Sequence, residues 1–166
     1  MKESLLQTLR RDYKPKLPYI LMEDFSQISI KKTPSKVVET VVKNSFPKTA
    51  EQPFIKLEKS KEIVNRKHSL KKIGVILSGG QAAGGHNVIS GLFDAMKKAN
   101  PDSVLYGFKG GPSGLIENKY IEITEPLLQQ YRNTGGFDII GSGRTKIQTE
   151  EQISSSIETA RKLDLD

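Results

Sequence analysis

The sequence of 166 residues contains no cysteine. This absence excludes a disulfide framework, a thiolate zinc site and a cysteine nucleophile. It also fits the reducing cytoplasm, where we expect the protein to act. No stretch approaches the roughly 20 apolar residues of a membrane-spanning helix, and the first residues lack the apolar core of a signal peptide. We therefore expect no membrane association.

Glycine is missing from the first part of the chain, because none of the 14 glycines precedes Gly74. Positive charge is concentrated in the same part. Residues 1–72 carry 17 Lys and Arg against 8 Asp and Glu, whereas residues 73–166 carry 9 against 11. The change in composition predicts two parts, an N-terminal extension over residues 1–70 and an α/β domain over residues 71–166.

The extension shows two short amphipathic patterns. Leu5, Leu6 and Leu9 share one helical face, and "SKVVETVVKNSF" (residues 35–46) repeats the pattern with valines. With the remaining segments interpreted as connections, these patterns predict a basic helical extension. A nucleic-acid surface is the alternative for a basic segment, but the basic residues are diluted with acids and form no dense block. We therefore expect a segment that packs along a domain, and no nucleic-acid partner.

Strand-like and helix-like segments alternate from residue 71 onwards. Apolar or alternating runs typical of strands occur at residues 72–78, 103–109, 119–124 and 137–142. Helical patterns occur at residues 87–100, 124–133 and 149–166. The first of these helices places Val88, Leu92, Ala95 and Met96 on one face. The alternation predicts an α/β fold with a doubly wound, mainly parallel sheet.

Four glycines separate the first strand-like run from the following helix: Gly79, Gly80, Gly84 and Gly85. In α/β sheets, ligands bind at the carboxyl ends of strands, where a helix that begins there presents unpaired N–H groups to anions. Glycines also let the backbone approach phosphate oxygens closely. We interpret this loop as a phosphate-binding site, and a purely structural turn is the alternative.

The spacing of these glycines excludes two common phosphate motifs. A Walker A loop would accept Gly79 and Gly84, but Gly85 and His86 stand where it requires Lys and then Ser or Thr. The dinucleotide-binding pattern G-x-G-x-x-G does not match either. His86 is interpreted as a polar residue at a helix start, and with His68 as the only other histidine we predict no metal site.

Two basic residues follow the strand-like run at residues 137–142. Arg144 comes just after its carboxyl end and Lys146 lies two residues later. An arginine there can hold a phosphate with two hydrogen bonds, and the lysine adds a positive charge. We predict that both contact a phosphate, and a solvated surface arginine is the alternative.

Three motifs resemble the phosphofructokinases: "IGVILSGGQAAGGHNVISG" (73–91), "GFKGGPSGL" (107–115) and "TGGFDIIGSGRTKI" (134–147). Their order and intervals are most similar to the long pyrophosphate-dependent form, and the resemblance covers residues 73–152. It implies the glycolytic transfer of phosphate from pyrophosphate to fructose 6-phosphate, giving fructose 1,6-bisphosphate, with Mg²⁺ as cofactor. By position, Gly79 matches the family's glycine at the phosphoryl donor, and Arg144 matches the arginine that reaches the donor phosphates.

The resemblance also implies features that these residues lack. The family's magnesium-binding and catalytic aspartates lie in G-G-D-D-S and T-I-D-x-D stretches, and neither stretch occurs here. We therefore expect no catalytic residue within this chain and no activity from the chain alone. We expect the complete form to be a homo- or hetero-oligomer. An ATP-dependent phosphofructokinase, or a non-catalytic phosphate-binding subunit that pairs with a full-length relative, stays open as an alternative.

Overall fold

The computed structural model describes residues 4–23, 27–60, 69–80 and 82–166. The chain divides into two compact units, one formed by Met1–Lys14 with His68–Asp166 and the other by Pro15–Lys67. Among the described residues, no helix combines the length and the apolar character needed to cross a bilayer.

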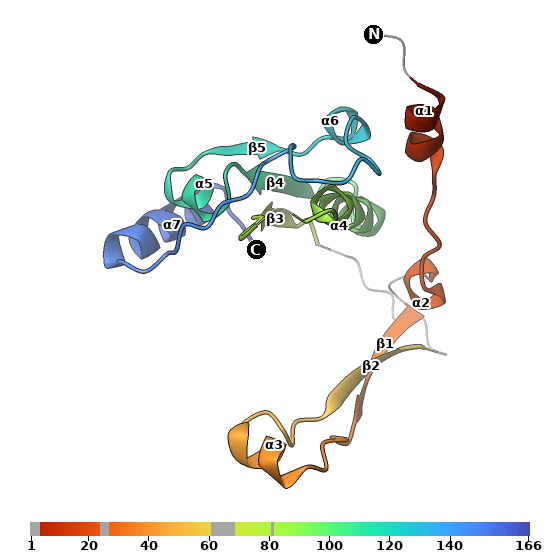
Figure 1. Cartoon of the computed structure of the whole chain (residues 1–166), viewed down its shortest axis with the longest axis vertical. Coiled ribbons are helices and arrows are strands. Elements are labelled where there is room, and N and C mark those ends of the chain that lie inside the picture. The colour runs from red at the N-terminus through yellow and green to blue at the C-terminus, as the bar shows by residue number, and fades with distance from the viewer. Residues whose placement is uncertain (1–3, 24–26, 61–68, 81) are drawn as a thin grey trace. The chain divides into compact units, whose positions relative to one another are not determined.

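A three-stranded sheet lies at the centre of the larger unit (Figure 1). Its strands, in spatial order, are β3 (Lys72–Val75), β4 (Val104–Phe108) and β5 (Tyr120–Glu122). The crossover helix α4 (Gly85–Ala99) returns the chain parallel to β3, but β5 is antiparallel to β4. The connection from β4 to β5 contains only the short helix α5 (Pro112–Ile116), and a parallel return needs a longer crossover. The predicted α/β fold is confirmed, but this sheet is mixed and not mainly parallel.

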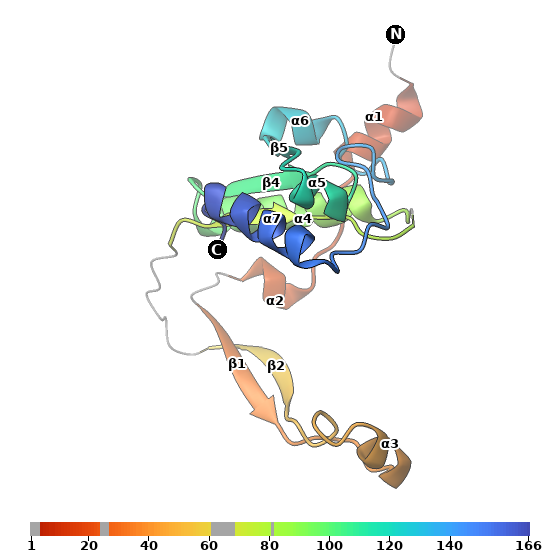
Figure 2. The same cartoon turned by 90° about the vertical axis from the view of Figure 1, so that its left-hand side faces the viewer.

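The sheet is covered on both faces. Figures 1 and 2 show α4 on one face and α7 (Glu150–Lys162) on the other. On the α4 side, the buried residues Ile89 and Phe93 pack with Leu105 of β4 in the main hydrophobic core. Helix α7 begins at Thr149, whose side chain accepts a hydrogen bond from the Gln152 N–H, in agreement with the predicted start of this helix.

The last residue of the sequence lies along the free edge of β3. The Lys71 carbonyl accepts a hydrogen bond from Val104 of β4, so the N–H and C=O of Lys72 point away from β4. There the Asp166 N–H donates to the Lys72 carbonyl at 3.0 Å, and the Asp166 carboxylate accepts from the Lys72 N–H at 2.8 Å. The hydrogen bond from the Lys71 ammonium, and then the one from the Lys72 N–H, lower the pKa of the Asp166 carboxyl. These contacts hold the end of α7 against the start of β3.

The segment 137–142 forms a turn, so the predicted strand there is wrong. The N–H groups of Ile140 and Gly141 both donate to the Phe137 carbonyl, at 3.2 Å and 2.6 Å. Gly141 has a φ of +69°, which a regular strand does not contain. Phe137, Ile139 and Ile140 are all buried. The run is apolar because its side chains enter the core, which a buried turn achieves as well as a strand does.

Helix α1 (Leu5–Asp12), which belongs to the larger unit, agrees with the predicted amphipathic helix. Ser4 caps it: its side chain accepts from the Gln7 N–H, and the Gln7 side chain accepts from the Ser4 N–H. Leu5, Leu6 and Leu9 are exposed. The apolar face of α1 is therefore not buried by the described residues.

The smaller unit contains an antiparallel hairpin of β1 (Ile28–Thr33) and β2 (Phe54–Lys59), with Thr33 opposite Phe54. It also contains the short helices α2 (Tyr19–Met22) and α3 (Thr40–Ser45). The N-terminal extension therefore includes a hairpin besides its helices, which the sequence analysis did not predict. The sequence does carry a strand signal here, because Ile28 and Ile30 alternate with polar residues in β1, and Ile55 and Leu57 do so in β2.

Candidate functional site

Three glycine loops meet at the carboxyl ends of β3 and β4. The Gly79 N–H, just after β3, donates to the Gly143 carbonyl at 2.9 Å. The Gly110 N–H, just after β4, donates to the Ile140 carbonyl at 2.8 Å. A parallel bridge pairs Ser78 with Gly143. Backbone hydrogen bonds therefore fix the three loops relative to one another.

Two further glycines allow this close approach. A Cβ on Gly111 would stand 2.5 Å from the Gly143 nitrogen, and a Cβ on Gly143 would overlap the Gly110 carbonyl oxygen. Neither Gly111 nor Gly143 was among the predicted site residues. The signal in the sequence is the repeated close spacing of glycines in "GFKGGPSG" and "GSGR", which marks loops whose backbones touch.

Gly79, Gly80 and Arg144 lie together in this cluster. A Cβ on Gly80 would stand 3.1 Å from Nη2 of Arg144, so the guanidinium lies over the Gly80 backbone. Gly79 has a φ of +105° and open space where a side chain would be. The Arg144 side chain is exposed. The arrangement presents an accessible guanidinium beside an open glycine backbone, which are the groups that a phosphate requires.

The other predicted residues have different surroundings. Gly84 is the N-cap of α4 with open space around it. Gly85 is buried, and a Cβ there would stand 2.6 Å from the Gly136 carbonyl oxygen, so close packing requires this glycine. Lys146 is exposed and makes no hydrogen bond or ion pair with the described residues.

His86 is a core residue with both ring nitrogens engaged. It is 1% exposed, and its Nε2 accepts a hydrogen bond from the Ile139 N–H at 3.2 Å. Its Nδ1 lies 2.8 Å from the Thr134 hydroxyl, which itself donates to the Tyr131 carbonyl. The Nδ1–H tautomer satisfies all of these contacts. His86 therefore holds the turn that leads to Arg144 and is not exposed to a phosphate. The other histidine, His68, lies outside the described residues.

We expect the stability of the larger unit to decrease in acid because of His86. Burial lowers the pKa of its imidazole, and the Asp138 carboxylate and the Gly135 carbonyl only partly oppose this effect. Below a pH of about 6.5 the unfolded imidazole binds a proton that the folded one does not bind, so stability is present above this pH and declines below it. One such group changes the free energy of unfolding by at most about 1.4 kcal/mol per pH unit.

Urea unfolding on both sides of this pH measures the effect. His86→Gln, which keeps His68, is the matched control and should show a smaller dependence between about pH 7.5 and pH 5.5. Equal dependence in both proteins would assign the acid sensitivity to other groups.

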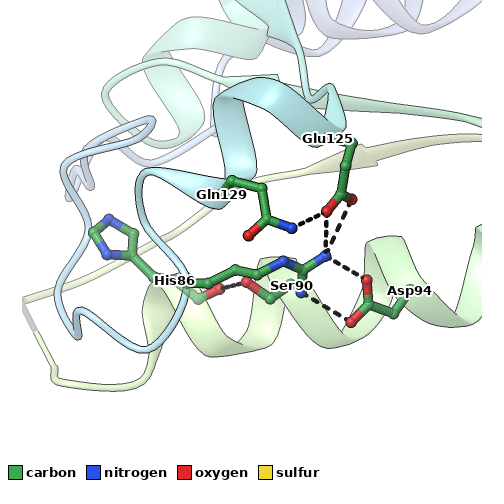
Figure 3. Close-up of polar contacts among 6 residues, drawn as sticks. His86, Ser90, Asp94, Glu125 and Gln129 are labelled. Atoms are coloured by element: carbon green, nitrogen blue, oxygen red, sulfur yellow. Dashed lines mark hydrogen bonds and ion pairs between the residues drawn. The ribbon is translucent and has the colours of Figure 1, made fainter. Parts of the chain in front are cut away.

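A network of charged side chains holds α4 to the segment after α6 (Glu125–Gln129). Arg132 donates to both carboxylate oxygens of Asp94, at 2.9 Å and 2.7 Å, and to Glu125 at 3.1 Å. Figure 3 shows Asp94 on α4 facing Glu125 and Gln129 on α6. The hydrogen bond to Asp94 is the main cause that raises the pKa of Arg132, so this guanidinium stays charged. This network links α4 to α6, and none of its residues belongs to the glycine loops.

The described residues contain no group of three or more His, Cys, Asp or Glu side chains that could hold a metal ion. Mg²⁺, which the family resemblance implies, prefers carboxylate oxygens, and Gly79, Gly80 and Arg144 carry none, so these residues do not fit it as ligands. No step of the chemistry can be assigned to a metal on the described residues.

Comparison with curated proteins identifies relatives of this chain. It is 47% identical over 165 residues to the pyrophosphate–fructose 6-phosphate 1-phosphotransferase of Porphyromonas gingivalis, covering 99% of this chain and 30% of that protein. It is 42% identical over 163 residues to the beta subunit of the same enzyme from Solanum tuberosum, covering 98% of the chain and 29% of the subunit. For an alpha subunit from Arabidopsis thaliana the identity is 36% over 171 residues, covering 98% and 28%.

No protein-family model matches the chain. The chain spans about 30% of the length of these relatives. The matches include the N-terminal extension, because they cover nearly all of the 166 residues. The resemblance to the phosphofructokinases is thereby confirmed: over nearly its whole length, this chain is homologous to part of the proteins named pyrophosphate–fructose 6-phosphate 1-phosphotransferase.

Proposed function

We propose that the glycine cluster binds the phosphoryl donor of a phosphofructokinase-type enzyme, and that this donor is pyrophosphate. The observation that carries the proposal is the position of the Arg144 guanidinium over Gly80, next to the open backbone of Gly79. The names of the relatives support transfer from pyrophosphate to fructose 6-phosphate. They favour pyrophosphate over ATP, and they support an enzyme over a non-catalytic phosphate-binding subunit.

In this proposal the chain positions the donor phosphate and offsets its negative charge. The Gly79 and Gly80 backbone lies against the phosphate, and Arg144 donates hydrogen bonds to its oxygens as negative charge shifts between them. The proposal extends to Gly84, the N-cap of α4, and to Lys146, which adds a positive charge. Gly85 acts through packing, because it brings the start of α4 against Gly136.

The remaining chemistry is assigned to residues outside this chain. Mg²⁺ would offset the charge of the phosphate oxygens, and we propose that its ligands come from residues outside this chain, because Gly79, Gly80 and Arg144 carry no carboxylate. We propose that the chain alone does not phosphorylate fructose 6-phosphate.

The resemblance also suggests a setting for the complete protein. We propose that it acts in the cytoplasm as an oligomer, since plant relatives are named as alpha and beta subunits. We further propose that residues 71–166 form its donor-binding part and that residues 1–70 form an extension.

Replacement of Arg144 tests the site. We expect Arg144→Ala to weaken pyrophosphate binding about tenfold or more, because one bidentate, charge-assisted contact contributes at least about 1.4 kcal/mol. Binding is measured by calorimetry, or by the NMR shifts of the Gly79 and Gly80 amides. Arg161→Ala, which removes an equal charge from α7, is the control and should bind like the unaltered chain. Unchanged affinity in Arg144→Ala would contradict the proposed site.

A further inference from the structure

A basic pocket lies between α1 and the segment that follows α6. Six side chains line it, and none of the six is a carboxylate: Gln7, Arg10, Arg11, Gln130, Arg132 and Thr134. All belong to the larger unit. The pocket shares no residue with the glycine cluster, so it is a separate place at which an anion can bind.

Helix α1 is attached at this pocket through its backbone. The Asn133 side-chain amide donates to the Arg10 carbonyl at 3.0 Å and to the Tyr13 carbonyl at 2.7 Å. Asn133 has a φ of +57°, a left-handed conformation that asparagine tolerates better than most residues. The Arg10 side chain takes no part in this attachment and makes no hydrogen bond or ion pair with the described residues. Its guanidinium therefore faces the pocket without a counter-ion among the described residues.

Arg132 forms the fixed side of the pocket. Asp94 and Glu125 hold its guanidinium in place, and its side chain is 18% exposed. Its Nε is buried and has no hydrogen-bond partner among the described residues. Because Asp94 and Glu125 offset the charge of Arg132, the positive charge of the pocket comes from Arg10, with Asp12 as its nearest acid in sequence.

This composition fits a small tetrahedral oxyanion. Guanidinium groups from two sides can donate to one phosphate group, and side-chain amides can add neutral donors. We propose that the pocket binds inorganic phosphate, or the phosphate group of a small monoester, between Arg10 of α1 and Arg132. Such an anion links α1 to the rest of the larger unit and so stabilises the docked helix. The proposal does not depend on the proposed enzymatic function.

Hydrogen exchange of the α1 amides tests this proposal on the complete 166-residue chain. At a phosphate concentration three times the dissociation constant, opening of the docked helix should slow about fourfold. Sodium chloride at matched ionic strength should not produce this effect. A parallel titration with glycerol 3-phosphate distinguishes free phosphate from a monoester as the preferred ligand, and protection by either one supports the proposal.

Two variants locate the response. Arg10→Gln should abolish the protection and still fold, because α1 has no buried residue and its attachment uses the Arg10 carbonyl. Lys14→Gln removes an equal charge from outside the pocket lining and should keep the protection. Arg144→Ala should also keep it, which separates this pocket from the glycine cluster. Protection that sodium chloride reproduces, that survives Arg10→Gln, or that neither phosphate compound produces would overturn the proposal.

Discussion

Replacing Gly143 with alanine should both destabilise the larger unit and remove its pyrophosphate binding. The added Cβ overlaps the Gly110 carbonyl oxygen, and both groups belong to backbones that hydrogen bonds hold in place. Relief requires the segment around Gly143 and the loop after β4 to move apart, and overpacking of this kind costs about 1–3 kcal/mol. Arg144 directly follows Gly143 and would move with it. We expect a lower urea midpoint and at least about a tenfold loss of pyrophosphate affinity.

Gly84→Ala is the matched control for this change. Gly84 has a negative φ of −98° and nothing near the position of a Cβ. Alanine is a poorer N-cap than glycine, and the difference is on the order of 1 kcal/mol or less. Alanine keeps the backbone N–H of Gly84 and adds no clash, so binding should stay close to that of the unaltered chain, and the loss of stability should be smaller than in Gly143→Ala. If Gly143→Ala behaves like Gly84→Ala, the contact between the glycine loops does not organise the site.

Replacing His86 with leucine should destabilise the turn that carries Arg144. Leucine fills much of the same space but offers no acceptor to the Ile139 N–H and no donor to Thr134. A buried N–H left without a partner costs about 1–3 kcal/mol. We expect the Ile139 amide to exchange with solvent about tenfold faster or more, since a difference of 1–2 kcal/mol changes an opening equilibrium by a factor of about 5–30.

Ser90→Ala separates this effect from a general loss of polarity in α4. The Ser90 hydroxyl is buried and donates to the His86 carbonyl, a bond within one helical turn that tethers no second element. Its removal should change the free energy of unfolding by less than about 1 kcal/mol. Equal acceleration of Ile139 exchange in both variants would show that the imidazole does not hold the turn.

The buried face of α4 differs in part from the face that the sequence pattern predicted. The prediction placed Val88, Leu92 and Met96 together, but Val88 is 61% exposed. The helix instead buries Ile89, Phe93 and Met96, together with His86. Both sets have helical spacing, and the choice between them depends on the rotation of the helix against the sheet. That rotation is set by the contact of Gly85 with Gly136, between residues far apart in the sequence.

Other elements also show which features a sequence pattern can predict and which it cannot. The start of α7 near Thr149 was predicted, because a cap depends on residues three positions apart. The turn at residues 137–142 was mistaken for a strand, because an apolar run reports burial and not backbone conformation. The hairpin of the smaller unit was missed although both strands alternate apolar and polar residues, because each alternating run is short.

The sequence by itself therefore determined the features that depend on local spacing and residue chemistry. It determined the α/β class, the start of α7, the likeness to phosphofructokinases and the glycine and arginine motifs of the candidate site. Only the tertiary structure decided that Gly79, Gly80 and Arg144 come together, that Gly85 and His86 serve packing, and that Arg10 and Arg132 face one pocket. Each of these depends on contacts between segments distant along the chain, and such contacts arise from the packing of whole elements, which no local pattern encodes.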